Sequence, residues 1–397
     1  MSSSFSPEVD GNHSDDEKDG VGVLPEDQVF EILTRVPLDD LATCRMVSTR
    51  WRRITYEPAF APLHCSRTAA VSGYLVQSLT HNRYRADFVS MPCSPPAPAV
   101  AISLDFLPSA HVRVVAVAAH RGLVCCVDVD AMRPTCYYVC KPATRQWRAL
   151  PNPRVRFDTV AVAMEARPSG ATRAEFKIVR FSRSVVVKPG DRLRCEVFDS
   201  RQFAWSQAPH VPLGPFSLQA QAPAVRAHGA MHWLRWSDHN TGAQDVFAFD
   251  VEAVKWRLIA LPQEVDQMDN PWARKKIGAV EGRLCLLVLT HAAGAVNEEV
   301  LEVWEMANYG EGRWTKKMTI SLKDLHEHDR RAVIHGVLHS SDVAFFCSFY
   351  RVMWYDFRKG KMAEVQVKNI GIGLQQIFKY ESDFNLCKIG RVCPSPS

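Results

Sequence analysis

Four tryptophans recur along the chain at intervals of about fifty residues, and this period restricts the possible fold more than any other feature. They are Trp147, Trp205, Trp256 and Trp314, separated by 58, 51 and 58 residues. Each follows a short strand-like run, for example residues 247–250 before Trp256. A repeat of this length, built from short strands, is typical of the blades of a β-propeller. About 320 residues carry the pattern, which predicts roughly six blades.

Other positions repeat together with the tryptophans. Glycines begin apolar runs in three of the copies: Gly122, Gly229 and Gly282. The last copy is degenerate and places Lys361 where the tryptophan is expected. A propeller closes by pairing strands from the two ends of the chain, because closure removes exposed strand edges. We therefore expect residues 376–380 to pair with residues 74–76, and we expect the four tryptophans to pack between blades.

The segment from residue 24 to residue 60 has a different pattern, that of three short helices. Leu24-Pro25 precedes two acidic residues, which is typical of a helix start. Apolar residues then follow at helical spacing, and Pro37 ends the first helix. The second helix is predicted to start at Leu38, and the third at Ser48 or Thr49. Three helices of about ten residues bury little on their own, so we expect this module to have a partner.

The same segment resembles an F-box. The family pattern is met by a series of matching positions: Leu24-Pro25, Ile32-Leu33, Pro37-Leu38, Leu41, residues 44–47 and Trp51-Arg52. The one clear departure is Val36, where family members usually carry Leu. The later segments YYVCKPATRQWRALP and FAFDVEAVKWRLIALP resemble the F-box-associated, kelch-like β-domains of plant F-box proteins.

This resemblance implies the fold class and the domain organisation. The expected fold is mainly β, with an N-terminal three-helix F-box followed by a roughly six-bladed β-propeller. The expected boundaries are a disordered acidic tail over residues 1–21, the F-box over 22–65 and the propeller over 66–392. The tail contains six acidic residues and one lysine within the first twenty residues, and such a composition disfavours folding.

The resemblance also implies a function. F-box proteins of this type are non-catalytic substrate-recognition subunits of Skp–cullin–F-box E3 ubiquitin ligases, so the expected partners are the Skp adaptor, through it a cullin-RING ligase, and an unknown target protein. The expected adaptor-docking face consists of eight residues: Leu24, Pro25, Ile32, Leu33, Leu38, Leu41, Val47 and Trp51. An alternative reading is that several of them, Ile32 and Val47 included, hold the helices together. Leu24, Pro25 and Leu38 are the favoured outer contacts.

Target binding is expected on the loops of the propeller, because binding residues usually lie on loops carried by a rigid scaffold. The leading candidates are the non-periodic segments 209–224 and 263–276, each with an aromatic residue outside the repeat. The candidate residues are Phe216, Trp272, Arg274 and Lys275. An aromatic beside a basic rim has the composition of an interface anchor. The alternative is that Trp272 packs back onto its own blade.

Several other functions lack support in the sequence. The net charge of +5 becomes +10 once the −5 of the first twenty residues is removed, but the basic residues are spread out, so we expect no nucleic-acid partner. The longest apolar run is interrupted by His120 and Arg121, which argues against a membrane partner. We expect an intracellular protein, cytoplasmic and/or nuclear, with reduced thiols.

Candidate chemical sites are weak. Four clustered cysteines lack paired zinc-ligand spacing and are expected to be core residues: Cys125, Cys126, Cys136 and Cys140. Residues 326–329, 180–194 and 274–276 are read as solvated connections, and His232 with Asp238 and His239 implies no catalytic set. We expect no cofactor and no metal. Two alternatives stay open: an F-box scaffold that does not promote degradation, and a kelch-like propeller enzyme.

Overall fold

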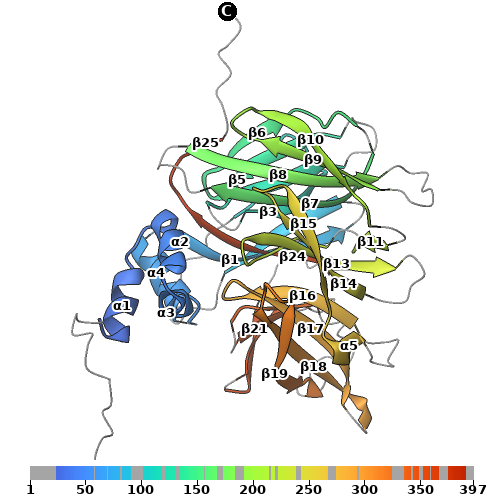
Figure 1. Ribbon diagram of the computed structural model, residues 1–397. Helices are drawn as coiled ribbons and strands as arrows, with labels where there is room; N and C mark the ends of the chain where they lie inside the picture. Colours follow the sequence, from blue (N-terminus) through green and yellow to red (C-terminus); the bar gives the residue numbers. More distant parts are fainter. Residues whose placement is uncertain are drawn as a thin grey trace, which may run out of the picture.

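The computed structural model describes residues 24–389 with gaps. The gaps fall at 58, 69, 81–82, 91–101, 119–120, 130–134, 156, 168–172, 184–191, 214–215, 220–221, 238–242, 267–273, 293–294, 324–334, 341–342, 348–351, 358 and 366–373. The expected acidic tail, residues 1–21, lies outside the described residues. Four helices lie on one side of a ring of β-sheets, beside β1 and β24 (Figure 1).

The helices begin close to where the sequence predicts. They are α1 (Glu26–Leu33), α2 (Leu38–Val47), α3 (Thr49–Ile54) and α4 (Phe60–Thr68). Pro25 is the N-cap of α1, and the Ser48 hydroxyl accepts a hydrogen bond from the Trp51 amide at the start of α3. The prediction of three helices omitted α4. Its signal was obscured by Pro62, which is tolerated there because it lies in the first turn of the helix.

The described strands form six sheets, which are the six blades of a propeller. Blade 1 contains β1 (Ala70–Thr80), β2 (Arg83–Ser90) and β24 (Leu374–Asp383). Blade 2 contains β3 (Val112–Val117), β4 (Val124–Asp128), β5 (Tyr137–Lys141) and β6 (Gln146–Leu150). Blade 3 contains β7 (Asp158–Arg167), β8 (Arg173–Arg183), β9 (Leu193–Asp199) and β10 (Ala204–Val211). The prediction of a mainly β fold with about six blades is confirmed.

The remaining blades follow in chain order. Blade 4 contains β11 (Phe216–Leu218), β12 (Val225–Ala227), β13 (Ala230–Ser237), β14 (Ala243–Asp250) and β15 (Lys255–Ala260). Blade 5 contains β16 (Arg274–Val280), β17 (Arg283–Ala292), β18 (Ala295–Asn308) and β19 (Arg313–Ser321). Blade 6 contains β20 (His335–Leu338), β21 (Val343–Cys347), β22 (Val352–Asp356) and β23 (Lys361–Val365). A short helix, α5 (Gln263–Asp266), connects blades 4 and 5, and a 3-10 turn, η1 (Pro142–Thr144), connects β5 and β6.

A four-residue hairpin before the last strand explains the spacing of the repeat. Its final residue is left-handed in five blades: Arg145, Phe203, Val254, Gly312 and Gly360. An Asp or Asn side chain at the start of the hairpin accepts backbone amide hydrogen bonds in four of them, for example Asp250 from Glu252 and Ala253. The repeated tryptophan follows two residues after the left-handed position. In blade 6 that position is Met362, opposite Tyr355, so the assignment of Lys361 was wrong by one residue.

The repeated tryptophans do not share one environment, so the expectation that all four pack between blades holds only in part. Trp205 is buried and its indole N–H donates to Pro151 O at 2.7 Å, just beyond the last strand of blade 2. Trp314 donates to Ala260 O at 2.8 Å, at the end of blade 4. Trp147 and Trp256 remain 43% and 38% exposed.

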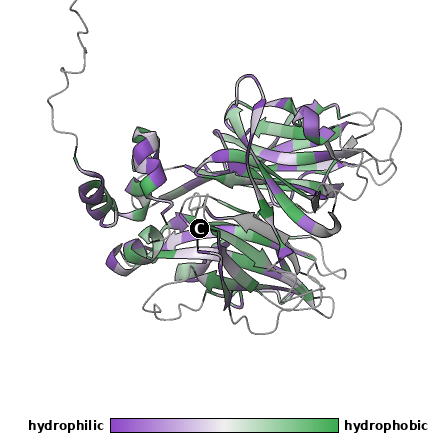
Figure 2. Ribbon diagram, turned by 90° about the horizontal axis from the view of Figure 1, so that it is seen from below, coloured by the Kyte–Doolittle hydropathy of each residue, from purple (hydrophilic) through white to green (hydrophobic). Residues whose placement is uncertain are grey.

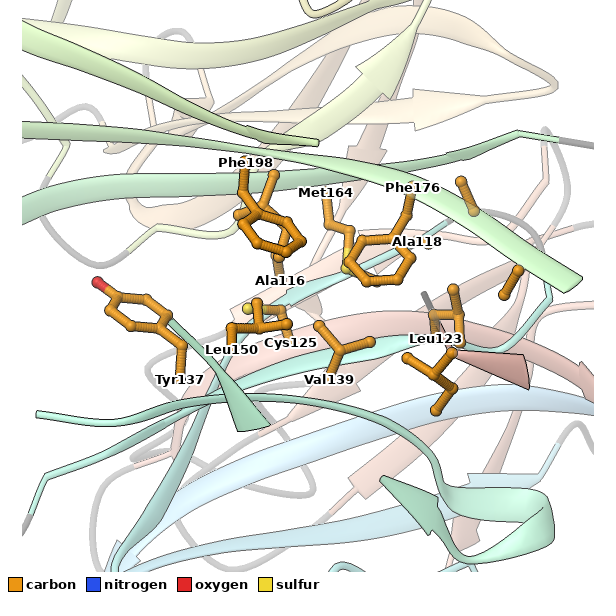
Figure 3. Packing of buried hydrophobic residues seen from close by; sticks show 14 of the residues in the cluster. Ala116, Ala118, Leu123, Cys125, Tyr137, Val139, Leu150, Met164, Phe176 and Phe198 are labelled. Carbon is orange, nitrogen blue, oxygen red and sulfur yellow. The ribbon is translucent and has the colours of Figure 1, made fainter. Parts of the chain in front are cut away.

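Large apolar side chains fill the spaces between neighbouring blades. Between blades 2 and 3, Tyr137 and Val139 of β5 face Met164 of β7, Phe176 of β8 and Phe198 of β9 (Figure 3). Phe176 and Phe198 stack with ring centroids 6.0 Å apart. Similar clusters occur between the other described blades, so most of the buried apolar area joins blades to each other.

The ring closes where the sequence predicts. β1 pairs with β24 in antiparallel register, with Tyr74 opposite Lys379 and Val76 opposite Ile377. Beside this pairing, the buried Gln77 amide bonds both backbone groups of Val114 in blade 2: Val114 N donates to Gln77 Oε1 at 2.6 Å, and Gln77 Nε2 donates to Val114 O at 3.0 Å. The side chain therefore pairs with the edge of blade 2 as another strand would.

The chain continues past β24 as a strap over blade 2, which we define as residues 383–389. Lys141 forms a buried ion pair with Asp383 and donates to Asn385 O at 2.7 Å. The Gln146 side chain bonds both the N–H and the carbonyl of Cys387. The strap ends in β25 (Lys388–Ile389), which pairs in parallel with the first residues of β8 in blade 3. Three consecutive blades are thus fastened by the C-terminal part of the chain.

Two left-handed glycines test how closely the closing strand is packed. A Cβ at Gly122 would lie 2.2 Å from Ser382 Oγ in β24, whereas a Cβ at Gly229 would meet nothing within 4 Å. We expect Gly229→Ala to lower the free energy of unfolding by about 1 kcal/mol, from backbone strain alone. Gly122→Ala should cost roughly 2 kcal/mol more, because overpacking adds to the strain. Thermal unfolding of both variants measures the difference, and equal melting temperatures would contradict the close approach.

Two truncated chains distinguish the contribution of the closing strand β24 from that of the strap. A chain ending at residue 373 lacks β24, so we expect the whole propeller to lose its cooperative unfolding transition. A chain ending at Leu386 keeps β24 but loses the buried Cys387 and Ile389 side chains, which should cost about 3 kcal/mol while the ring stays closed. Calorimetry distinguishes these results. An unchanged melting transition in the shorter chain would show that the ring does not depend on β24.

Candidate functional site

The helical module has a small core of its own. Its buried side chains come from all four helices: Val29, Leu33, Leu41, Ile54 and Phe60. The rings of Phe30 and Phe60 pack edge to face with centroids 5.7 Å apart, so α4 completes the core of the first three helices. Leu38 and Trp51 are partly buried against this cluster.

Other apolar residues of the module remain exposed. Leu24, Ile32, Met46 and Val47 are 44%, 49%, 68% and 64% exposed, and Pro25 is also exposed. They are contributed by the start and end of α1 and by the end of α2. Because the core is already filled by other side chains, these residues are available to a partner. Figure 2 shows hydrophobic and hydrophilic segments mixed along the helices beside the propeller.

The structure therefore divides the eight candidate adaptor-docking residues. Leu24, Pro25, Ile32 and Val47 lie on the surface, whereas Leu33 and Leu41 are 0% and 1% exposed and hold the helices together. The alternative that Ile32 and Val47 hold the helices together does not fit these two positions, because their side chains are 49% and 64% exposed. Met46 was not among the candidate docking residues, although it lies within residues 44–47, which match the F-box pattern.

Polar contacts join the helices of the module to each other. Arg50 of α3 donates to the Leu24 carbonyl at 2.9 Å, which ties the start of the chain to α3. Arg53 pairs with Glu26 at 2.6 Å between α3 and α1. His64 of α4 contacts Val36 O through Nε2 at 2.8 Å, and burial lowers the pKa of this imidazole so that it stays neutral. The exposed face is thus a defined surface and does not depend on a partner for its shape.

The candidate target-binding residues are not brought together by the described structure. Trp272 lies outside the described residues, as do residues 267–273 around it. Arg274 and Lys275 belong to strand β16, so the expectation of a loop through residue 276 was wrong; Arg274 lies 3.6 Å from Glu299 of the same blade. Phe216 begins strand β11. The basic run 180–194 also differs from expectation, because Arg180 is buried and paired with Glu196 at 2.6 Å.

The cysteines and the histidine that were considered as metal-binding or catalytic residues are buried in the core where the structure describes them. Cys125, Cys126 and Cys140 are fully buried among apolar side chains, as expected for core cysteines, and burial raises the pKa of Cys125. His232 is buried, bonds Tyr309 at 2.9 Å, and burial lowers its pKa to about 4. Asp238, His239 and residues 326–329 lie outside the described residues. Among the residues that the structure describes, no cluster of three potential metal ligands occurs.

No helix in the described part of the chain is both long and apolar enough to span a membrane.

Comparison with known proteins identifies both parts of the chain. Residues 90–390 match the F-box associated beta propeller domain, and residues 21–61 match the F-box-like family. The chain is similar to the F-box protein At5g49610 of Arabidopsis thaliana, with 24% identity over 85% of this chain and 89% of the relative. It is 32% identical to the F-box protein At5g41720 of the same species, over 40% of this chain and 86% of the relative.

A third relative, the Arabidopsis F-box protein At5g03970, is 23% identical over 72% of this chain and 66% of its own length. The propeller match covers most of the chain and includes blades 2 to 6 and the closing strand β24, while β1 and β2 of blade 1 precede it. The F-box-like match includes α1 to α3. The chain therefore belongs to the family of F-box proteins that carry an F-box-associated β-propeller domain.

Proposed function

We propose that the protein is the substrate-recognition subunit of a Skp–cullin–F-box ubiquitin ligase. One observation carries the proposal: within the F-box-like segment, Leu24, Ile32, Met46 and Val47 stay exposed although the module has a filled core of its own. An apolar surface of this kind is typical of a docking site. The Skp adaptor is the partner that members of this family are expected to bind there.

In this role the chain performs no bond chemistry. The propeller holds a target protein, and the adaptor connects the chain to the cullin-RING arm that carries the ubiquitin-loaded conjugating enzyme. Holding a target lysine close to the thioester makes the transfer effectively intramolecular, which is a large kinetic advantage. Such a complex acts in the cytoplasm or the nucleus, where we expect this protein.

The propeller surface that binds the target is proposed to be the one away from the helices. Arg52 of α3 lies close to the Gly282 turn of blade 5, and the helices also contact β24. These contacts occupy the side of the ring that carries the turns between the first and second strands. Phe216, at the start of β11, and Arg274 and Lys275, at the start of β16, lie toward the other side of the ring, where the chain enters each of these blades.

The adaptor-docking face is tested by truncating its exposed side chains. We expect the triple variant Leu24→Ala, Ile32→Ala, Val47→Ala to lose roughly 3 kcal/mol of adaptor affinity, about 100-fold, if each side chain becomes buried in the interface. Titration of purified chain with the Skp adaptor measures the affinity. The matched control is Phe384→Ala with Leu386→Ala, which removes two apolar side chains of the strap that are 42% and 71% exposed. Equal affinities of the triple variant and the control would end the docking proposal.

Target half-life separates the ligase from a scaffold. Affinity purification with the triple variant should enrich targets, because a target that is captured but not ubiquitylated accumulates on the chain. The half-life of an enriched protein should lengthen when the triple variant replaces the normal chain. A half-life that does not change would favour a scaffold that binds the adaptor without promoting degradation.

A further inference from the structure

The F-box contacts the propeller through the strand that closes the ring. Arg45 of α2 places Nη1 2.9 Å from Glu381 Oε2 in β24, and the two side chains are only 13% and 9% exposed. Lys379, on the same face of β24, places Nζ 3.1 Å from the other carboxylate oxygen. Burial opposes ionisation of Glu381, but the two cations outweigh it and hold the pKa of this carboxyl well below its ordinary value. The carboxylate is therefore charged and paired at neutral pH.

Contacts within the F-box orient the Arg45 side chain toward β24. Its Nε donates to Thr55 Oγ1 at 3.0 Å, and its guanidinium lies 5.3 Å from the ring centroid of Tyr56. Lys379 Nζ lies 4.7 Å from the same ring, so Tyr56 is contacted by cations from both parts of the chain. The Arg45 carbonyl accepts a hydrogen bond from Arg52 at 2.9 Å. A guanidinium restrained in this way defines the orientation of its partner as well as its distance.

Two other contacts between the F-box and the propeller lie away from this ion pair, one made by Ala61 and one by Arg52. In α4, Phe60 belongs to the F-box core, while the next residue, Ala61, packs against the cluster formed by blades 1 and 6. Only residue 69 separates the end of α4 from the start of β1, so the connection is too short for a flexible linker. The other contact is made by Arg52 beside the turn at Gly282, where a Cβ added to Gly282 would lie 3.9 Å from the Arg52 side chain.

Helix α2 therefore has two functions on two faces. Arg45 points to the propeller, whereas Met46 and Val47 are exposed on the proposed docking surface. We propose that Arg45 and Glu381 are positioning residues, whose ion pair fixes the angle between the adaptor-docking helices and the propeller. This proposal rests on the proposed ligase function: a fixed angle presents a bound target to the conjugating enzyme at one distance and one orientation, as efficient transfer requires.

The angle is measured on the chain alone, with spin labels introduced as unnatural amino acids at Gln28 and Lys255. Both positions are exposed, one in α1 and one in β15 of blade 4. Pulsed electron paramagnetic resonance should give a single narrow distance peak for the normal chain. Arg45→Met and Glu381→Gln should each lose this peak and give a broad distribution. Arg45→Lys keeps the charge but loses the hydrogen bond from Nε to Thr55, so it should broaden the peak less than Arg45→Met does.

The matched control is Arg53→Met, which breaks the ion pair with Glu26. This pair joins two helices of the same module, and its side chains are 60% and 48% exposed. The variant removes the same charge from the same module, and because an exposed ion pair contributes little to stability, the narrow peak should remain. Retention of the narrow peak in both Arg45→Met and Glu381→Gln would overturn the proposal.

A second measurement separates positioning from folding. The Arg45→Met and Glu381→Gln variants should keep the adaptor affinity of the normal chain and a single cooperative propeller transition, at a lower temperature for Glu381→Gln, which leaves the Arg45 charge uncompensated. Loss of adaptor binding together with the narrow peak would show that Arg45 maintains the fold of the F-box, and this result would also overturn the positioning role. Failure of the normal chain to bind the adaptor would count against the proposed function instead, and the distance measurement would still decide whether the junction is rigid.

Discussion

The antiparallel pairing of β1 with β24 is the interaction on which the rest of the structure depends. It joins residues about three hundred positions apart in the sequence, and it completes blade 1, which packs against blade 6 on one side and blade 2 on the other. Closure is supported by polar groups that would be costly to bury unpaired. Gln77 bonds the edge of blade 2 and the Gln376 side chain, while Lys141 pairs with Asp383.

The same strand also links the two parts of the chain. Along β24, Gln376 accepts a hydrogen bond from Gln77 of β1, Glu381 pairs with the F-box and Asp383 begins the strap over blade 2. A buried ion pair contributes little net stability compared with an apolar pair, but removing one partner leaves an uncompensated charge. The arrangement therefore favours one relative orientation of helices and propeller. Its value lies in specificity of geometry more than in added stability.

The F-box combines a filled apolar core with apolar residues that remain exposed on its surface. Its core is completed by Phe60 from α4, a helix that also packs against the propeller. Because α4 and the propeller supply what three short helices lack, Ile32, Met46 and Val47 are not needed inside and remain on the surface. The partner that the module needs for folding is thus part of the same chain.

The sequence by itself determined the fold class, the number of blades and the strands that close the ring, because these follow from a repeat period and from local patterns of turns and apolar residues. It also located the helix starts at Pro25, Pro37 and Ser48, where capping is a local property. It did not show which apolar residues of the F-box face outward: Ile32 and Leu33 are adjacent, and only the packing of α4 and α3 against α1 decides that Leu33 is buried. Nor could it pair Arg45 with Glu381, or Gln77 with Val114, since these contacts exist only once the ring has closed and brought distant segments together.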